Sequence, residues 1–373
     1  MEPNRIHISP FQFTLLVFMF VTGSSILLTP LPLIKAAKQD AWIAAVAGVL
    51  MGLAVIALYI YIGKSYPGKT FFEFIDEIFG KFLGKVITGM YLFFVFLLSA
   101  QVLSNLGDFI VSQIMIETPK EYIHALFLVP VLYAAVLGLE SYSRAAEALL
   151  PSLLLLIIIF MLVLLPDIDF SNLTPVNGEG ALAIFEGSLA VLQFPYIEMF
   201  LLLALFPFVY SPEEAGKAFM IGGIAGGFIL IINPLFITLV LGSAFAETVL
   251  YPSFILAKKV SIGDFLERVE VLLAAIWIIT LFFKLIVCFH ITVKGVNYLT
   301  GLKSSNLLIF PIGIIVWVTS IIVYPNFAYF QSVVASTLSY KLVFGLILPA
   351  VMGIITFVKK KQKNKQPAQG PIS

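Results

Sequence analysis

Two short interruptions in apolar segments carry the residues of this chain best suited to holding a small molecule. The first is Gly23-Ser24-Ser25, where glycine tolerates backbone angles that other residues avoid and the two hydroxyls can pair freed backbone groups. A helix that restarts after such an interruption presents unpaired N–H groups and a positive dipole end, which suits a carboxylate. The sequence therefore favours a ligand site here, although the same small residues could instead mark a close contact between membrane helices.

The second interruption is Gln193-Phe194-Pro195-Tyr196, followed closely by Glu198. Pro195 lacks a backbone N–H and clashes with the preceding turn, while Gln193 and Tyr196 supply polar groups that lipid does not accept. A carboxylate this deep in an apolar segment must face the protein interior and be protonated or paired. Glu198 is thus predicted either to titrate or contact a gate, or to pin the broken helix through a structural hydrogen bond.

A polar stripe runs along another apolar segment. Gln101, Asn105, Asp108 and Ser112 stand at i, i+4, i+7 and i+11, which places them on one face of a helix. Such a stripe holds helices together about as often as it contacts a ligand. Gln101 and Asn105, the deeper pair, are the ligand candidates, whereas Asp108 lies nearer the helix end and could be solvated.

Thr280 and Lys284 share a helical face in a later segment, and Lys284 is the only basic residue well inside a predicted span. Its ammonium could take the position of a bound cation, as a fixed or protonatable charge. Alternatively, its long stem could reach the nearby membrane interface. The sequence leaves both interpretations open.

Composition narrows the class of protein. With 60% hydrophobic and 12% charged residues and a mean hydropathy of +1.05, the chain could not form a soluble globule. A net charge of +1 argues against nucleic acid as a partner. One cysteine excludes a disulfide framework, and no Cys/His cluster has the spacing of metal ligands. No catalytic constellation or phosphate-binding loop is present, so we predict neither an enzyme nor a cofactor.

Ten segments are apolar and long enough to cross a bilayer, which predicts an all-α polytopic membrane protein with a single transmembrane domain, residues 1–373. The segments lie near residues 10–35, 41–63, 82–113, 122–139, 143–165, 182–208, 214–242, 265–297, 304–323 and 338–358. The interrupted ones are the first and the sixth. Broken helices five spans apart are typical of an inverted repeat of five plus five helices, here about 10–165 and 182–358.

The distribution of basic residues predicts the orientation in the membrane. Ten spans put both termini on one side, where lysines and arginines outnumber those opposite by about two to one, so the termini are predicted to be cytoplasmic. Lys341 is assigned to the opposite, external side. Residues 65–81 are expected to form a short amphipathic internal segment. The basic tail, 359–373, is expected to be solvated, with membrane lipid as a neighbour.

Three local motifs resemble one known family over nearly the whole chain. They are DIDFSNLTP at 167–175 with Gly178-Glu179-Gly180, the pair Tyr251-Pro252, and the run ERVE at 267–270. Together they are similar to the spore germination permease family, the B subunits of the nutrient germinant receptors of spore-forming bacteria. The chain departs from the pattern expected at the first interruption, because Ser25 stands where a second glycine would be.

The resemblance implies an amino acid/polyamine/organocation (LeuT-like) transporter fold used as a sensor. Such a subunit would bind an amino acid, sugar or similar nutrient between the broken helices, near Gly23, residues 194–198 and Lys284. It would act with a larger A subunit and a lipoprotein C subunit in the inner spore membrane. A proton-coupled amino-acid permease is the alternative, because both functions use the same scaffold.

Overall fold

The computed structural model describes residues 7–259, 268–325, 329 and 339–363. Glu267 of the third motif, the first residues of the spans predicted at 265–297 and 338–358, and the tail from 364 onward lie outside this part. The described residues form no strand and are mostly helical. The predicted all-α architecture is therefore confirmed.

The first half of the chain is built from eight α-helices. They are α1 (Pro10–Thr22), α2 (Ser25–Leu28), α3 (Pro30–Ala37), α4 (Ala41–Ser65), α5 (Phe71–Phe79), α6 (Lys81–Gln113), α7 (Lys120–Leu137) and α8 (Leu139–Leu164). The second half contains α9 (Gly180–Val191), η4 (Leu192–Tyr196), η5 (Glu198–Ala204), η6 (Phe206–Phe208), α10 (Pro212–Leu241), α11 (Ser243–Ala246), α12 (Pro252–Lys259), α13 (Glu270–Thr300), α14 (Asn306–Ile322), η7 (Val343–Ile347) and α16 (Leu348–Lys363).

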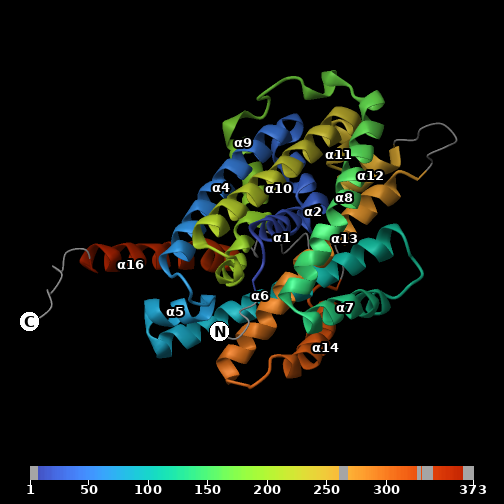
Figure 1. The fold of residues 1–373 in the computed structure, drawn as a ribbon. Coiled ribbons are helices and arrows are strands. Elements are labelled where there is room, and N and C mark those ends of the chain that lie inside the picture. The colour runs from blue at the N-terminus through green and yellow to red at the C-terminus, as the bar shows by residue number, and fades with distance from the viewer. Residues whose placement is uncertain (1–6, 260–267, 326–328, 330–338, 364–373) are drawn as a thin grey trace, which may run out of the picture.

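Within the described part, nine helical segments are long and apolar enough to cross a membrane. The remaining predicted span corresponds to α14, an apolar helix of 17 residues, whereas a perpendicular crossing needs about 20. Membrane spanning is thus supported, while the exact count of ten stays a prediction. Figure 1 shows α1 and α2 at the centre of the bundle, with α16 extending from one side.

The first predicted span is interrupted where the sequence placed the break. Helix α1 stops at Gly23, whose φ of −31° and ψ of −97° are not helical. The chain continues as the single turn α2, and α3 begins at Pro30. The carbonyl of Ile26 in α2 accepts hydrogen bonds from the Asn233 side chain and the Ser253 hydroxyl, both at 2.7 Å. These partners satisfy a carbonyl that the break would otherwise leave unpaired.

The sixth predicted span is interrupted at Phe194. Its φ of −127° and ψ of 107° are extended, so the helix that begins at Gly180 ends before it. Pro195 explains the position of this break, because it has no backbone N–H to donate to the preceding turn. The chain then restarts as the tighter helix η5, whose first residue is Glu198. Both predicted breaks are confirmed.

Glycines let α10 pack closely against α1. A Cβ atom on Gly222 would lie 2.6 Å from Cβ of Val17, and one on Gly226 would lie 2.5 Å from Cβ of Val21. Small residues at such crossings allow two backbones to approach, which is how membrane helices gain contact area without a hydrophobic driving force. The central helix α1 therefore depends on these two glycines for its position.

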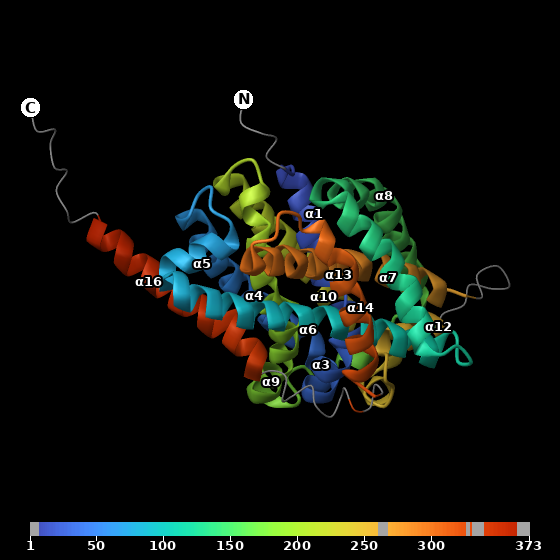
Figure 2. The same ribbon diagram turned by 90° about the horizontal axis from the view of Figure 1, so that it is seen from below.

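Contacts between helix ends show which of these ends lie on the same face of the molecule. On one face, Lys64 at the end of α4 pairs with Glu213 at the start of α10, and Gln12 in α1 donates to Glu147 in α8 at 3.0 Å. On the other face, the Asp40 carboxylate accepts backbone N–H groups of Asn177 and Gly178. In Figure 2 the first turn of α1 and the last turn of α16 lie toward the same side, opposite α3 and α9.

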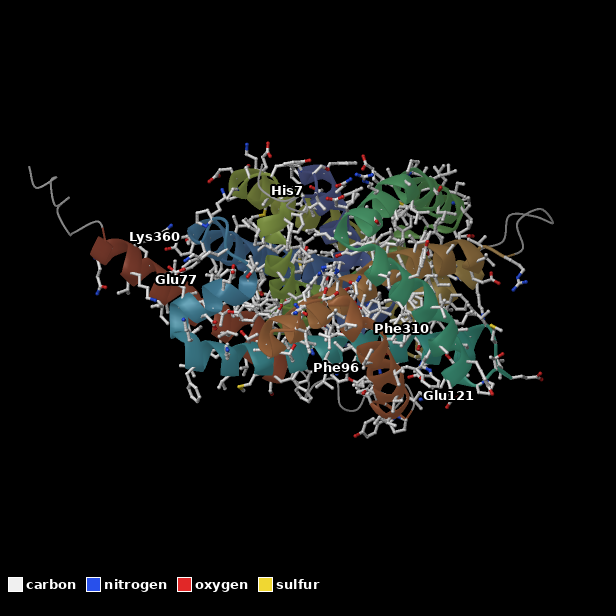
Figure 3. All side chains as sticks on the ribbon, turned by 60° about the horizontal axis from the view of Figure 1, so that its bottom comes forward. His7, Glu77, Phe96, Glu121, Phe310 and Lys360 are labelled. Atoms are coloured by element: carbon white, nitrogen blue, oxygen red, sulfur yellow. The ribbon has the colours of Figure 1, made fainter. Side chains whose placement is uncertain are left out.

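The predicted amphipathic segment forms the helix α5, which lies beside α16. Asp76 accepts a hydrogen bond from the Tyr298 hydroxyl of α13 at 2.6 Å. Lys359 of α16 donates to the carbonyls of Glu77 and Ile78, which are among the unpaired carbonyls at the end of α5. Figure 3 shows Glu77 and Lys360 close together at this edge of the molecule. Helix α5 therefore joins α13 to α16.

The motif at residues 167–175, the first of the three that resemble a known family, forms hydrogen bonds between the loop before α9 and the end of α10. The backbone N–H of Asp169 and the side-chain amide of Asn172 both donate to the Leu239 carbonyl at 3.0 Å. That carbonyl belongs to the last turn of α10, where helical partners are missing. Hydrogen bonds from Ser171 also lower the pKa of the exposed Asp169 carboxyl. The loop is therefore held by its own motif residues.

We expect Gly226→Ala to destabilise the protein by roughly 1–3 kcal/mol, because the added methyl group overpacks the contact with Val21. The matched control is Gly89→Ala in α6, where the nearest atom to the new Cβ would be 3.9 Å away. This control should be neutral or stabilising by up to about 1 kcal/mol, because alanine is the better helix former. Thermal melting of the purified full chain measures both. Equal shifts for the two variants would contradict the proposed packing.

Candidate functional site

A buried ion triad joins three elements at the centre of the molecule. Glu198, at the start of η5, accepts a hydrogen bond from Lys284 of α13 through Oε2 and from Lys341 through Oε1, each at 2.6 Å. Lys341 lies in the helical turn that precedes η7. All three side chains are at most 1% exposed. Such short contacts between charged groups are stronger than neutral hydrogen bonds.

The triad connects the two helix breaks. The ammonium of Lys284 also donates to the Ser24 hydroxyl at 2.7 Å, so one lysine holds both the first break and the start of η5. Aromatic rings cover the cations: Lys284 lies 4.7 Å from the centre of the Phe20 ring, and Lys341 lies 3.3 Å from that of Phe194. Rings in this position stabilise a cation through their quadrupole.

The triad carries a surplus positive charge when all three groups are ionised. Two ammonium groups share one carboxylate, and an ammonium has three donors. Among described residues, Lys341 donates only to Glu198. A buried charge without a partner costs several kcal/mol, and breaking such a pair costs about 3–5 kcal/mol. The site is therefore suited to a second acceptor, either an acid group or another oxygen of a ligand.

Gly23 is explained by the stem of Lys284. A Cβ atom at position 23 would lie 3.1 Å from both Cβ and Cδ of Lys284. The glycine thus gives the lysine room to cross the break and reach Ser24 and Glu198. The sequence favours a ligand site at Gly23, with a close contact between helices as the alternative, and in the structure the group next to this glycine is the Lys284 side chain.

The polar stripe of α6 extends toward the triad. The Gln101 amide donates to the hydroxyl of Tyr340 at 2.9 Å, and Tyr340 immediately precedes Lys341. Asn105 is 5% exposed, and its Oδ1 has no hydrogen-bond partner in the described part of the chain. The same is true of the Ser25 hydroxyl, which is fully buried. These groups are acceptors or donors that a ligand could pair.

Other predicted site residues have partners of their own. The Thr280 hydroxyl donates to the carbonyls of Ile276 and Trp277 in its own helix. The Tyr196 hydroxyl donates to the Gly223 carbonyl at 2.9 Å, which turns the ring toward α10. Gln193 is 7% exposed and lies inside the second break. The structure therefore assigns a packing role to Tyr196, and places Ser24, Phe194, Glu198 and Lys284 together.

Lys341 is the residue that the sequence prediction misplaced. The sequence predicts Lys341 on the external side and Lys284 as the only basic residue well inside a span, yet Lys341 is 1% exposed and contacts Glu198. Its position just inside an apolar segment was the available signal.

Solved structures with the same fold include Mhp1 and MhsT. The chain superposes on Mhp1, described as a nucleobase-cation-symport-1 family transporter in a closed conformation with bromovinylhydantoin bound, with a TM-score of 0.68 over 97% of this chain and 82% of Mhp1. It superposes on MhsT in complex with L-phenylalanine with a TM-score of 0.57 over 95% and 87%. The identities are 12% and 13%, so the likeness concerns the fold alone. It confirms the predicted LeuT-like class.

Closer similarity is found among curated proteins. Spore germination protein KB of Bacillus subtilis is 28% identical over 374 residues, which cover 99% of each chain. Spore germination protein A2 of the same organism is 25% identical over 367 residues, with 98% of this chain and 99% of the relative covered. The family model described as spore germination protein matches residues 7–328, most of the chain. This chain therefore belongs to the spore germination protein family.

Proposed function

We propose that this chain is the nutrient-sensing integral membrane subunit of a spore germination receptor. Family membership supports the role in germination, and the buried triad supports the position of the ligand. The ligand is a small nutrient, an amino acid or a molecule of similar size, bound between the two helix breaks. The single observation on which the site depends is that Glu198 is shared by Lys284 and Lys341.

The surplus charge of the triad gives a way for binding to change the structure. An acid or other oxygen acceptor of the nutrient pairs with Lys341, which then shares its donors between Glu198 and the ligand. Glu198 is the first residue of η5, so a weaker contact to Lys341 lets η5 shift relative to the turn before η7, while Lys284 still joins η5 to α13. A ligand that binds the shifted arrangement more tightly than the original one raises the population of the shifted arrangement. The size of this change is set by the difference between the two affinities.

Helix α5 is positioned to receive that shift. Phe200 of η5 packs edge-on against Phe71 of α5, with ring centres 5.3 Å apart, and also lies 5.8 Å from Tyr91. Packed aromatic rings at this distance move together because protein interiors have few voids. A displacement of η5 is therefore transmitted to the face that carries α5 and α16.

The remaining features of the proposal concern assembly and orientation. The partners are a larger A subunit and a lipoprotein C subunit, in the inner membrane of the spore. Both chain ends face the cytoplasm, in agreement with the excess of lysine and arginine on that side. The two inverted repeats comprise about residues 10–165 and 182–358, followed by the basic tail.

A proton-coupled amino-acid permease is the second candidate, because the solved structures that share the fold include transporters. Uptake of labelled amino acids by proteoliposomes that contain the full chain separates the two functions. Accumulation driven by a proton gradient favours the permease. Nutrient binding without accumulation favours the sensor.

We expect Glu198→Gln to lower the amount of assembled protein strongly, because it leaves two buried ammonium groups without an anion. The cost should be about 3–5 kcal/mol. Adding Lys284→Met and Lys341→Met to this variant should restore the protein level, since no buried charge remains, but not the response to nutrient. Membrane protein level and germination rate measure these outcomes. A fully functional Glu198→Ala variant at normal level would exclude any role for the triad.

We expect Lys341→Met to separate binding from folding. It leaves the neutral pair of Glu198 and Lys284 intact, so the protein level should hold, while the nutrient concentration for half response should rise at least about tenfold. Lys284→Met, the matched variant, should instead reduce protein level, because Ser24 and Glu198 lose their shared donor. Dose responses to a panel of amino acids and sugars measure the shift. Unchanged midpoints for Lys341→Met would move the ligand away from the triad.

A further inference from the structure

A cavity opens at the end of α6, away from the triad. It has a volume of about 680 Å³ and lies between the end of α6, the start of α7 and the residues after α14. Its charged lining residues are three carboxylates, Asp108, Glu117 and Glu121, and one ammonium, Lys120. Figure 3 places Glu121 at the side of the molecule away from Glu77 of α5. A cavity lined mainly by negative charge raises the local concentration of cations.

Asp108 is the unusual member of this lining. It is 9% exposed and belongs to a membrane-spanning helix, where a carboxylate is costly unless it has a partner. Its Oδ2 is buried and has no hydrogen-bond partner among the described residues. Its Oδ1 lies 3.9 Å from the Lys120 ammonium, which is too long for a hydrogen bond.

The Lys120 ammonium forms its hydrogen bonds with groups other than Asp108. It donates to the carbonyl of Tyr324 at 3.0 Å and to that of Pro325 at 3.3 Å. These bonds hold the start of α7 against the chain that follows α14. Lys120 therefore lowers the cost of the Asp108 charge by proximity without satisfying the carboxylate, and a buried acceptor of this kind is expected to have a donor or cation.

We propose that this cavity binds a monovalent cationic group, either an ammonium or an inorganic monovalent cation, with Asp108 as its main contact and Glu117 and Glu121 at the rim. Divalent metal is disfavoured, because the described residues contain no group of three side chains arranged to hold a metal ion. The cation competes with Lys120 for the Asp108 carboxylate.

The α6 stripe connects this site to the triad. Asp108 and Asn105 lie on the same helical face as Gln101, and Gln101 contacts Tyr340 beside Lys341. The cavity at the end of α6 therefore carries a net negative charge and the triad a net positive charge, and one polar face of α6 runs between them. A role of this cavity in nutrient entry from outside rests on the proposed function, but cation binding itself does not.

The test titrates the full chain in lipid nanodiscs with methylammonium chloride and, separately, potassium chloride, at ionic strength held constant with tetraethylammonium chloride, whose bulky cation has no N–H donor. Tryptophan fluorescence reports binding, since Trp317 donates to the Glu121 carbonyl and Trp277 packs on Phe109. Asp108→Asn should raise the midpoint at least about tenfold, because the charged acceptor is lost. Lys120→Gln should lower it severalfold, because the competing cation is lost.

The matched control is Glu179→Gln, an exposed carboxylate on the same face and outside the cavity, which should leave the midpoint unchanged. Saturation by methylammonium alone identifies an ammonium site, and saturation by both salts identifies a general monovalent-cation site. No saturable change in the wild-type chain, or equal midpoints in Asp108→Asn and wild type, overturns the proposal. If Asp108→Asn does not assemble, the midpoints of Glu117→Gln and Lys120→Gln test the proposal in its place. Unchanged midpoints in both variants overturn the proposal. None of these results depends on the nutrient response.

Discussion

Moving a carboxylate from water into the interior of a membrane protein costs several kcal/mol, and Glu198 can be tolerated there because two ammonium groups meet it. This requirement fixes the relative positions of η5, α13 and the turn before η7. Lys284 extends the constraint to Ser24, so the two broken helices cannot move independently. The rest of the bundle is arranged around an ionic contact between segments that the sequence separates widely.

Close packing makes that contact possible. Gly23 leaves room for the stem of Lys284, and Gly222 and Gly226 let α10 lie against α1, so the central helix is held from two sides. Each glycine is explained by a neighbouring atom rather than by an unusual backbone angle alone. The broken helices are thus enclosed by helix pairs whose separation depends on residues without side chains, and small changes there would alter the geometry of the triad.

The sequence was informative where the cause was local. Pro195 and Gly23 produce breaks by their own chemistry, and apolar length identifies spans, so the breaks and the fold class were predictable. The pairing of Lys341 with Glu198 was not, because the residues are 143 positions apart and the lysine stands near a predicted boundary. Likewise, only the three-dimensional contacts show that the Tyr196 hydroxyl pairs with α10 and that Asp108, for which the sequence left solvation open, is 9% exposed.

Sensing and transport place different demands on this scaffold. A transporter must open toward both faces, so the contacts that seal the α5 face have to break in each cycle. Here α5 is joined to its neighbours by Phe71 against Phe200, by Tyr298 on Asp76 and by Lys359 at the end of the helix. A sensor needs only to strain these contacts, because its output is a changed surface for a partner. A shift of η5 carried through Phe200 to α5 meets that requirement without opening a path across the membrane.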